Sequence, residues 1–333
     1  MRKLIWIIIV LAGLFCGWWM LASATVERGL ATWVGDRRAE GWQAELTALP
    51  VTGFPTRFDL VLNDLALADP ATGLALRMQG LQLTARSYWP GDVAVTLPQT
   101  PIEFSTPDAR LTVTAKEAKA ALRLHPGPTL ELDQMVATSG AWQLDGPAGN
   151  LLQASDADAE ITQGAKAETY RFALSAGQLV PGGLIRTALR LPVDWPLAFD
   201  AFAADVTIIF DAPLNRYTLE DRRPQPREIE AKRIDFHWGP LRLNATGRLA
   251  IDPTGVAEGE VKLLVENWRS ALDLAEQSGA MADRLRPQAE LMLNALANMG
   301  DNPETLDLTL GFRDGGMFLG PISLGPAPHL ILR

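Results

Sequence analysis

The feature that most restricts the fold of this chain is a two-residue alternation of apolar and polar side chains, which begins near Pro50 and continues almost to the C-terminus. Segments such as FDLVL (58–62) and DVAVTLP (92–98) place apolar residues at every second position, the period of a half-buried β-strand. Turn sequences such as WPGD, HPGP and VPGG separate these segments. The sequence therefore predicts a mainly β fold: a long, curved antiparallel sheet or sheets with a few helices, after one N-terminal transmembrane helix.

Two of the turns share one design. DPTG (252–255) and DPATG (69–73) each lie between two alternating segments. The Asp at the start can accept hydrogen bonds from the backbone that follows it, the Pro fixes φ near −65°, and the Gly adopts a left-handed conformation without steric cost. We therefore predict two hairpins of similar construction, with Gly255 and Gly73 at their left-handed positions.

The N-terminus carries the second strong signal. Arg2 and Lys3 precede an uncharged run over residues 4–24, which is long enough to cross a bilayer as a helix. Basic residues stay on the cytoplasmic side, so the run predicts a single-pass inner-membrane protein with the bulk of its chain in the periplasm. A cleaved signal peptide is the alternative, because Ala-Ser-Ala at 22–24 resembles a cleavage site. The length of the apolar run favours an uncleaved anchor.

The chain divides into segments of different pattern. We expect the following parts: a membrane anchor at 1–24, a juxtamembrane helix at 25–49, an N-terminal β region at 50–220 and a C-terminal β region at 227–333. The charged, proline-rich stretch 219–230 is either a domain boundary or a long loop. Near 268–300 the pattern predicts a pair of helices, the second of which carries Leu291, Leu296 and Met299 on one face.

Composition and motifs argue against several functions. The net charge is −9 and no cluster of Lys and Arg is present, which excludes a nucleic-acid partner. The single cysteine, Cys16, lies in the apolar run, and the three histidines lack the spacing of metal ligands. The acidic segment SDADAE (155–160) begins like a calcium loop, but Ile161 stands where that loop needs glycine. Phosphate-binding, nucleophile-elbow and dinucleotide motifs are missing. We expect no catalytic, cofactor-binding or metal-binding residues, and no enzyme activity.

Several strings resemble those of a known family when they are taken together and in order. They are GFPTRFDLVLNDLALADPATGL, ARSYWPGDVAVTLP, LPVDWPLAFDAF, RPQPREIEAKRIDFHWGPLRLNATGRLAIDPTG and FLGPISLGPAPHL. After an N-terminal anchor, they resemble the bacterial domain-of-unknown-function family 2125 of Gram-negative envelope proteins. The resemblance implies location and architecture but no activity. The layout alone is also similar to the AsmA group of anchored envelope proteins, some of which carry lipids on an apolar groove.

Two functional hypotheses follow. If the apolar side of the sheet is open, it could bind phospholipid or another envelope lipid, with six residues lining the groove: Phe58, Leu60, Leu62, Leu243, Leu263 and Val265. If the helical pair near 268–300 covers that side, a periplasmic scaffold that binds other envelope proteins is the better account. Alternation does not separate the two, since both need one apolar side.

Overall fold

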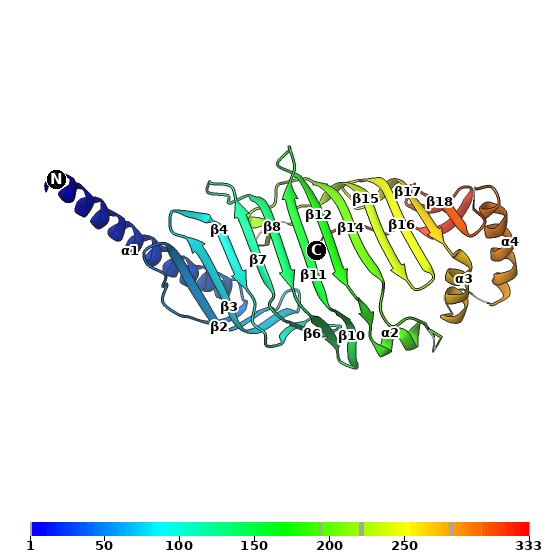
Figure 1. The fold of residues 1–333 in the computed structure, drawn as a ribbon, viewed down its shortest axis with the longest axis horizontal. Helices are drawn as coiled ribbons and strands as arrows, with labels where there is room; N and C mark the ends of the chain where they lie inside the picture. The colour runs from blue at the N-terminus through cyan, green and yellow to red at the C-terminus, as the bar shows by residue number, and fades with distance from the viewer. Residues whose placement is uncertain are drawn as a thin grey trace. The chain divides into compact units, whose positions relative to one another are not determined.

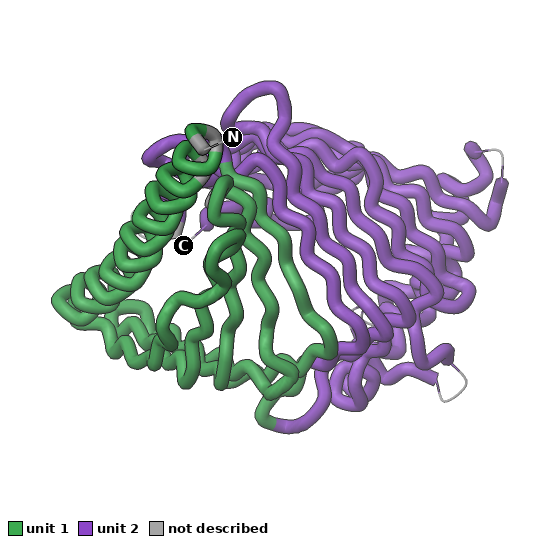
Figure 2. Tube along the Cα trace, turned by 60° about the vertical axis from the view of Figure 1, so that its left-hand side comes forward, with its two compact units in different colours: residues 1–124, 144–147 green, residues 125–143, 148–333 purple. Residues whose placement is uncertain are grey.

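The computed structural model describes residues 2–192, 195–219, 223–279, 281, 283–300 and 302–332. The fold is mainly β, its strands pair antiparallel and the sheet does not close, which confirms the predicted fold class (Figure 1). The chain forms two compact units, shown in Figure 2. Unit 1 consists of residues 1–124 and 144–147, and unit 2 consists of residues 125–143 and 148–333.

Unit 1 begins with a long helix, α1 (Arg2–Ala39). The part Ile5–Ala39 is long and apolar enough to cross a membrane. α1 therefore continues past the expected anchor and takes in most of the expected juxtamembrane helix. The helix ends ten residues earlier than 49, because Gly41 follows it at φ 93°, a left-handed position that stops a helix.

From Trp19 onward, α1 packs on the strands of unit 1. Trp19 is buried, its ring stacks on Phe58 with centroids 5.5 Å apart, and its indole N–H donates to the carbonyl of Arg57 at 3.1 Å. Further along the helix, Glu27 accepts a hydrogen bond from the backbone N–H of Val51 at 2.9 Å. α1 is thus part of the unit 1 core and not only a segment that precedes it.

The strands of unit 1 pair antiparallel, but not always with the next strand in the chain. They are β1 (Gln43–Ala48), β2 (Arg57–Asp69), β3 (Leu74–Arg86), β4 (Trp89–Thr96), β5 (Ile102–Ser105), β6 (Arg110–Ala115) and β7 (Lys119–Leu124), with most of β9 (Trp142–Gly146). β2 lies between β1 and β3, β3 also pairs with β4 and β5 along different parts of its length, and β4 pairs with β7. The buried side chains of β2 alternate as its sequence predicts.

Unit 2 contains the longer series of strands. They are β8 (Leu132–Ser139), β10 (Gly149–Ala154), β11 (Asp156–Gln163), β12 (Thr169–Gly177), β13 (Val180–Pro181), β14 (Ala201–Phe210), β15 (Pro226–Trp238), β16 (Leu241–Ile251), β17 (Ala257–Glu266), β18 (Thr305–Arg313), β19 (Gly316–Leu319) and β20 (Ile322–Pro326). The helices are α2 (Gly183–Ala188), η1 (Arg216–Leu219), α3 (Trp268–Gln277), η2 (Asp283–Leu285) and α4 (Arg286–Ala297).

Most strands of unit 2 lie side by side in one series. The pairing runs β8, β11, β12, β14, β15, β16, β17, β18, β19 and β20 (Figure 1). The compact units divide near Leu124. Of the charged stretch 219–230, residues 226–230 begin β15 in unit 2, residues 223–225 precede that strand, and residues 220–222 lie outside the described residues.

The helical pair near 268–300 is present, but its second member presents a different face to the sheet. Ala289, Leu293 and Ala297 of α4 pack on the sheet cluster with α3. Leu291 and Met299, which we expected to face the sheet, are 76% and 83% exposed. Both faces of α4 are apolar, so its sequence does not select one, and the face with the smaller residues allows the helix to approach the strands closely.

The repeated turns have the predicted conformation. Gly255 and Gly73 have φ of 86° and 72°. In the DPTG turn, the carboxylate of Asp252 accepts hydrogen bonds from the backbone N–H groups of Thr254 and Val256 at 2.8 and 2.9 Å. The turn therefore satisfies its own backbone, and it joins β16 to β17 in a fixed register.

We expect Gly255→Val to lower the free energy of unfolding by about 1–3 kcal/mol, because valine is strained at this φ. A Cβ at this position would also lie 2.4 Å from the Cγ1 atom of Ile331 in the C-terminal segment. The matched control is Gly311→Val on β18, where a Cβ meets no atom within 4 Å. Denaturant unfolding of the full chain in detergent measures both. Equal stability of the two variants would contradict the turn assignment.

Candidate functional site

In unit 2, paired residues on neighbouring strands point to the same side of the sheet, and one such row of paired residues is apolar throughout. Leu174 on β12 lies opposite Ala204 on β14, which lies opposite Ile234 on β15. The row continues through Ala245 on β16 to Leu263 on β17. Because alternate residues of a strand share a side, β8 to β18 build one continuous surface, here called the apolar face. Among the described residues, the strands β14 to β18 contribute no polar side chain to it.

The other side of the same strands, the polar face, is charged. Residues directly next to those of the apolar face point to it, as Asp205 does beside Ala204. Arg171, Glu230, Arg248 and Lys262 also lie on this side. The two sides of one sheet therefore differ sharply in polarity.

One rim of the apolar face is tightly packed, at the ends of β12, β14 and β16. Tyr170 is fully buried, and its ring meets that of Phe210 with centroids 6.2 Å apart. The Tyr170 hydroxyl accepts a hydrogen bond from the backbone N–H of Leu214 at 3.0 Å. Burial raises the pKa of this hydroxyl. Nearby, the C-terminal segment crosses the β16–β17 turn, where the N–H of Leu330 donates to the carbonyl of Gly255 at 2.9 Å.

The opposite rim is closed by aromatic rings. The ring of Phe199, from the segment before β14, lies 4.7 Å from that of Phe236 and 4.6 Å from that of Trp238. The Trp238 indole N–H donates to the carbonyl of Pro196 at 2.9 Å, and Arg186 of α2 donates to the same carbonyl at 3.0 Å. This rim is thus held by ring contacts and by hydrogen bonds to the backbone.

Between the rims the apolar face is not covered. Its central side chains are only half-buried, and Leu174 is 43% exposed. We call these residues the open floor: Ala159, Ile161, Phe172, Leu174, Ala204, Val206, Ile208, Ile229, Ala231 and Ile234. Contiguous apolar surface of this kind is uncommon on soluble domains and marks a binding surface.

The end of the apolar face at β16–β18 is covered by α3 and α4. Trp268 and Leu272 of α3 and Ala297 of α4 are buried with Leu241 and Leu306 of the strands. The Trp268 indole N–H donates to the carbonyl of Pro303 at 3.0 Å, which fixes the start of α3. The helices therefore cover one end of the face and leave the floor open.

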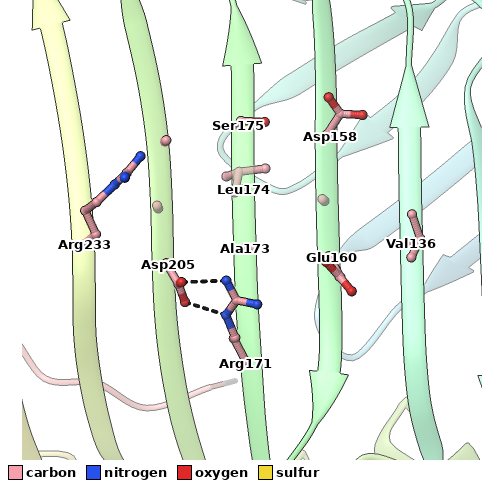
Figure 3. Close-up of a pocket in the computed structure, with 12 residues that line it drawn as sticks. Val136, Asp158, Glu160, Arg171, Ala173, Leu174, Ser175, Asp205 and Arg233 are labelled. Carbon is pink, nitrogen blue, oxygen red and sulfur yellow. Dashed lines mark hydrogen bonds and ion pairs between the residues drawn. The ribbon is translucent and has the colours of Figure 1, made fainter.

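The polar face carries a depression of about 480 Å³, shown in Figure 3. Two hydrogen bonds of 2.9 and 2.7 Å join the guanidinium of Arg171 to the carboxylate of Asp205. The hydrogen bond from Arg171 holds the pKa of Asp205 below its usual value, and the same bond raises the pKa of Arg171. The two charges satisfy each other in contact with water, so we assign the pair no chemistry beyond surface pairing.

Acidic residues of β11 also lie on the polar face, as strand alternation predicts. Glu160 accepts a hydrogen bond from Gln134 at 2.9 Å, and Asp156 accepts one from the backbone N–H of Gly177 at 3.1 Å. In the part of the chain that the structure describes, no group of three potential metal ligands comes together.

The six residues predicted to line a groove lie in two separate places. Phe58, Leu60 and Leu62 are buried in unit 1 in a cluster that includes Trp19 of α1. The other three lie on the apolar face of unit 2: Leu243, Leu263 and Val265. Leu243 and Val265 are register partners, and all three pack on the cluster beneath α3 and α4. None of the six belongs to the open floor.

Sequence reasoning missed the floor residues on β11, β12, β14 and β15. Alternation in TYRFALSA (169–176) and DVTIIFDA (205–212) indicates strands, but a covered strand and an open strand give the same pattern. A weak signal was present in the small size of Ala159, Ala204 and Ala231, since the centre of a packed core is usually filled by larger residues.

We expect alanines on the floor and at the rim to respond differently to enlargement. Ala257 at the rim is fully buried, so Ala257→Leu should cost about 1–3 kcal/mol of stability through overpacking. Ala204→Leu on the half-buried floor should change the free energy of unfolding by less than about 0.5 kcal/mol. Thermal or denaturant unfolding of both full-length variants checks this. Equal destabilisation would show that the floor is as tightly packed as the rim.

Comparison with known proteins gives a family. Residues 19–328 match DUF2125, described as an uncharacterized protein conserved in bacteria. Because the match covers nearly the whole chain, the protein belongs to this family. No curated protein and no solved structure matches the chain.

Proposed function

We propose that this member of DUF2125 is a membrane-anchored, non-catalytic protein of the bacterial envelope that binds the acyl chains of a membrane lipid on the open floor of unit 2. The observation that carries the proposal is the difference between the packed borders of the apolar face and its accessible centre. Its rims are packed and its β16–β18 end is covered, yet apolar side chains between them are accessible. Leaving such a surface in water is unfavourable, so a ligand that covers it is favoured by roughly 25 cal/mol for each Å² of apolar area removed from water.

A lipid fits this surface better than a polar ligand does. The floor offers no hydrogen-bonding side chain, and a buried polar group without a partner costs free energy. Lipid is also close at hand, because α1 has the length and composition of a membrane span. The positively charged Arg2 and Lys3 at the start of α1 support an inner-membrane orientation with units 1 and 2 in the periplasm.

We expect the mature chain to retain residues 2–24. Trp19 is part of the unit 1 core, so cleavage after Ala24 would remove a buried tryptophan, a loss of about 3–5 kcal/mol for truncation to alanine. Intact mass spectrometry of the protein from membranes measures the N-terminus. A reporter fused to the C-terminus should be active only on the periplasmic side. A mature chain beginning at Thr25 would contradict the anchor.

Lipid binding is tested by two neighbouring positions on β14. A photo-crosslinking amino acid at Ala204 should label lipid in cells, because position 204 lies on the open floor. The same amino acid at Ala203 should not, because Ala203 lies on the opposite side, at the polar depression. The two variants have the same strand and a nearly equal distance from the rims. Lipid adducts at neither position, or at both equally, would refute binding on the floor.

A scaffold that binds other envelope proteins is the second candidate, and one observation favours it. Leu291 and Ala295 of α4 and Met299 just after it are exposed apolar residues. In the crosslinking experiment, Leu291 serves as a third position. Adducts with other proteins at position 291, without lipid adducts at position 204, would favour the scaffold.

A further inference from the structure

The open floor has a long direction and a short one. Along the strands, the floor on β14 reaches only from Ala204 to Ile208, roughly 13 Å at about 3.3 Å per residue. Buried residues close it at one end, and the aromatic rings around Phe236 and Trp238 close it at the other. Across the strands, half-buried apolar side chains continue from β8 to β15, five adjacent strands that span about 19 Å at roughly 4.8 Å between neighbours, and the row ends at β16, where Ala245 is buried.

The two ends of the long direction differ in chemistry. At β16–β18, the face runs under α3 and α4 into the cluster around Trp268, which is dry and closed. At β8 and β11, polar side chains join the apolar face. Gln163 of β11 is the register partner of Tyr170 and donates to its hydroxyl at 3.0 Å. The Gln163 carbonyl oxygen lies 2.7 Å from the Nε2 atom of His125. Ser139 of β8 pairs with Ala157 on the same side.

On the basis of the proposed lipid binding, we infer that the ligand is a long, unbranched acyl chain that lies across the strands, with its polar end at β8 and β11 and its methyl end at β15 and β16. The length supports this class. One leaflet of a bilayer is about 15 Å of hydrocarbon, half of the roughly 30 Å core, so an apolar row of about 19 Å accommodates a whole extended chain. A compact hydrophobe such as a sterol would leave much of this length uncovered.

The polarity gradient supports the direction. A headgroup at β16 would be buried beneath α3 against Leu243 and Leu306, where the described residues offer it no hydrogen-bonding side chain. At the end of β11 next to Tyr170, a headgroup meets Gln163 and His125, whose side chain is about half exposed. Because burying an unpaired polar group is costly, only the second direction is favourable.

The test uses the full chain in its native membranes and a single-chain phospholipid that carries a photoreactive diazirine at one of three places. The diazirine sits near the headgroup, at mid-chain or at the terminal methyl, and peptide mass spectrometry maps the adducts. We expect labels on β8 and β11, then on β12 and β14, and then on β15 and β16. If all three probes label the same strand, or if the order is reversed, the inferred orientation is wrong while lipid binding stands. If no probe labels the floor, the proposed function itself fails.

A blocking substitution gives an independent measurement. Ala204→Trp places a large ring midway along the chain path, so the terminal-methyl probe should lose its labels on β15 and β16 while the headgroup probe keeps its labels on β8 and β11. Ala203→Trp, on the polar face of the same strand, should change neither. Labels on β15 and β16 that survive Ala204→Trp, or equal labelling of the floor by a photoreactive sterol, would overturn the inference.

Discussion

The organisation of unit 2 depends on an unbroken antiparallel register. In the series β8, β11, β12, β14, β15, β16, β17 and β18, each strand pairs with its neighbour so that the apolar set of one strand lies beside the apolar set of the next, while the charged side chains lie on the other side. A slip of one residue at any strand would send its apolar set to the polar face. The pairing of β15 with β16 has a bulge between Ala231 and Ile234. Lys232 and Arg233 lie in this bulge, and after it Ile234 is again on the apolar face. Turns such as DPTG and Gly239-Pro240, with glycine at positive φ, keep successive hairpins in step.

Residue size then decides where this face is closed and where it is open. Aromatic residues gather at the strand ends, where Phe199, Phe236 and Trp238 interlock at one rim and Tyr170 and Phe210 meet at the other. Phe199 reaches across from the segment before β14, the other rings belong to the strands, and together they exclude water, as their large apolar area allows. Between the rims the floor consists mostly of alanine, valine and isoleucine, with Phe172 and Leu174 on β12, and these side chains are half-buried or exposed. The same alternating pattern therefore produces packed edges and an accessible centre.

The sequence was sufficient for the strands, the glycine turns and the N-terminal helix, because each follows from local chemistry: a period of two, a residue suited to positive φ, or a long apolar run. It was insufficient for everything that depends on which surfaces meet. Phe58 and Leu243 both occupy apolar rows, yet one packs beneath α1 and the other lies near α3. α4 has two apolar faces, and its pattern gave no reason to prefer Leu293 over Leu291 as the residue that contacts the strands. Whether another layer packs on the apolar side of a strand depends on the tertiary structure. The period-two alternation is the same for a covered strand and for an open one.

In the proposed orientation, α1 connects the membrane to unit 1 without an intervening linker. A span of about 20 residues from Arg2 places Trp18 and Trp19 at the outer interface of a bilayer, where aromatic residues are favoured. Trp19 is also the residue that packs on Phe54 and Phe58, with ring centroids 5.3 and 5.5 Å away. Phe54 is itself 53% exposed beside it. In the proposed orientation, the edge of unit 1 that carries these rings therefore lies at the membrane surface, and the depth of α1 in the bilayer and the packing of unit 1 are set by the same tryptophan.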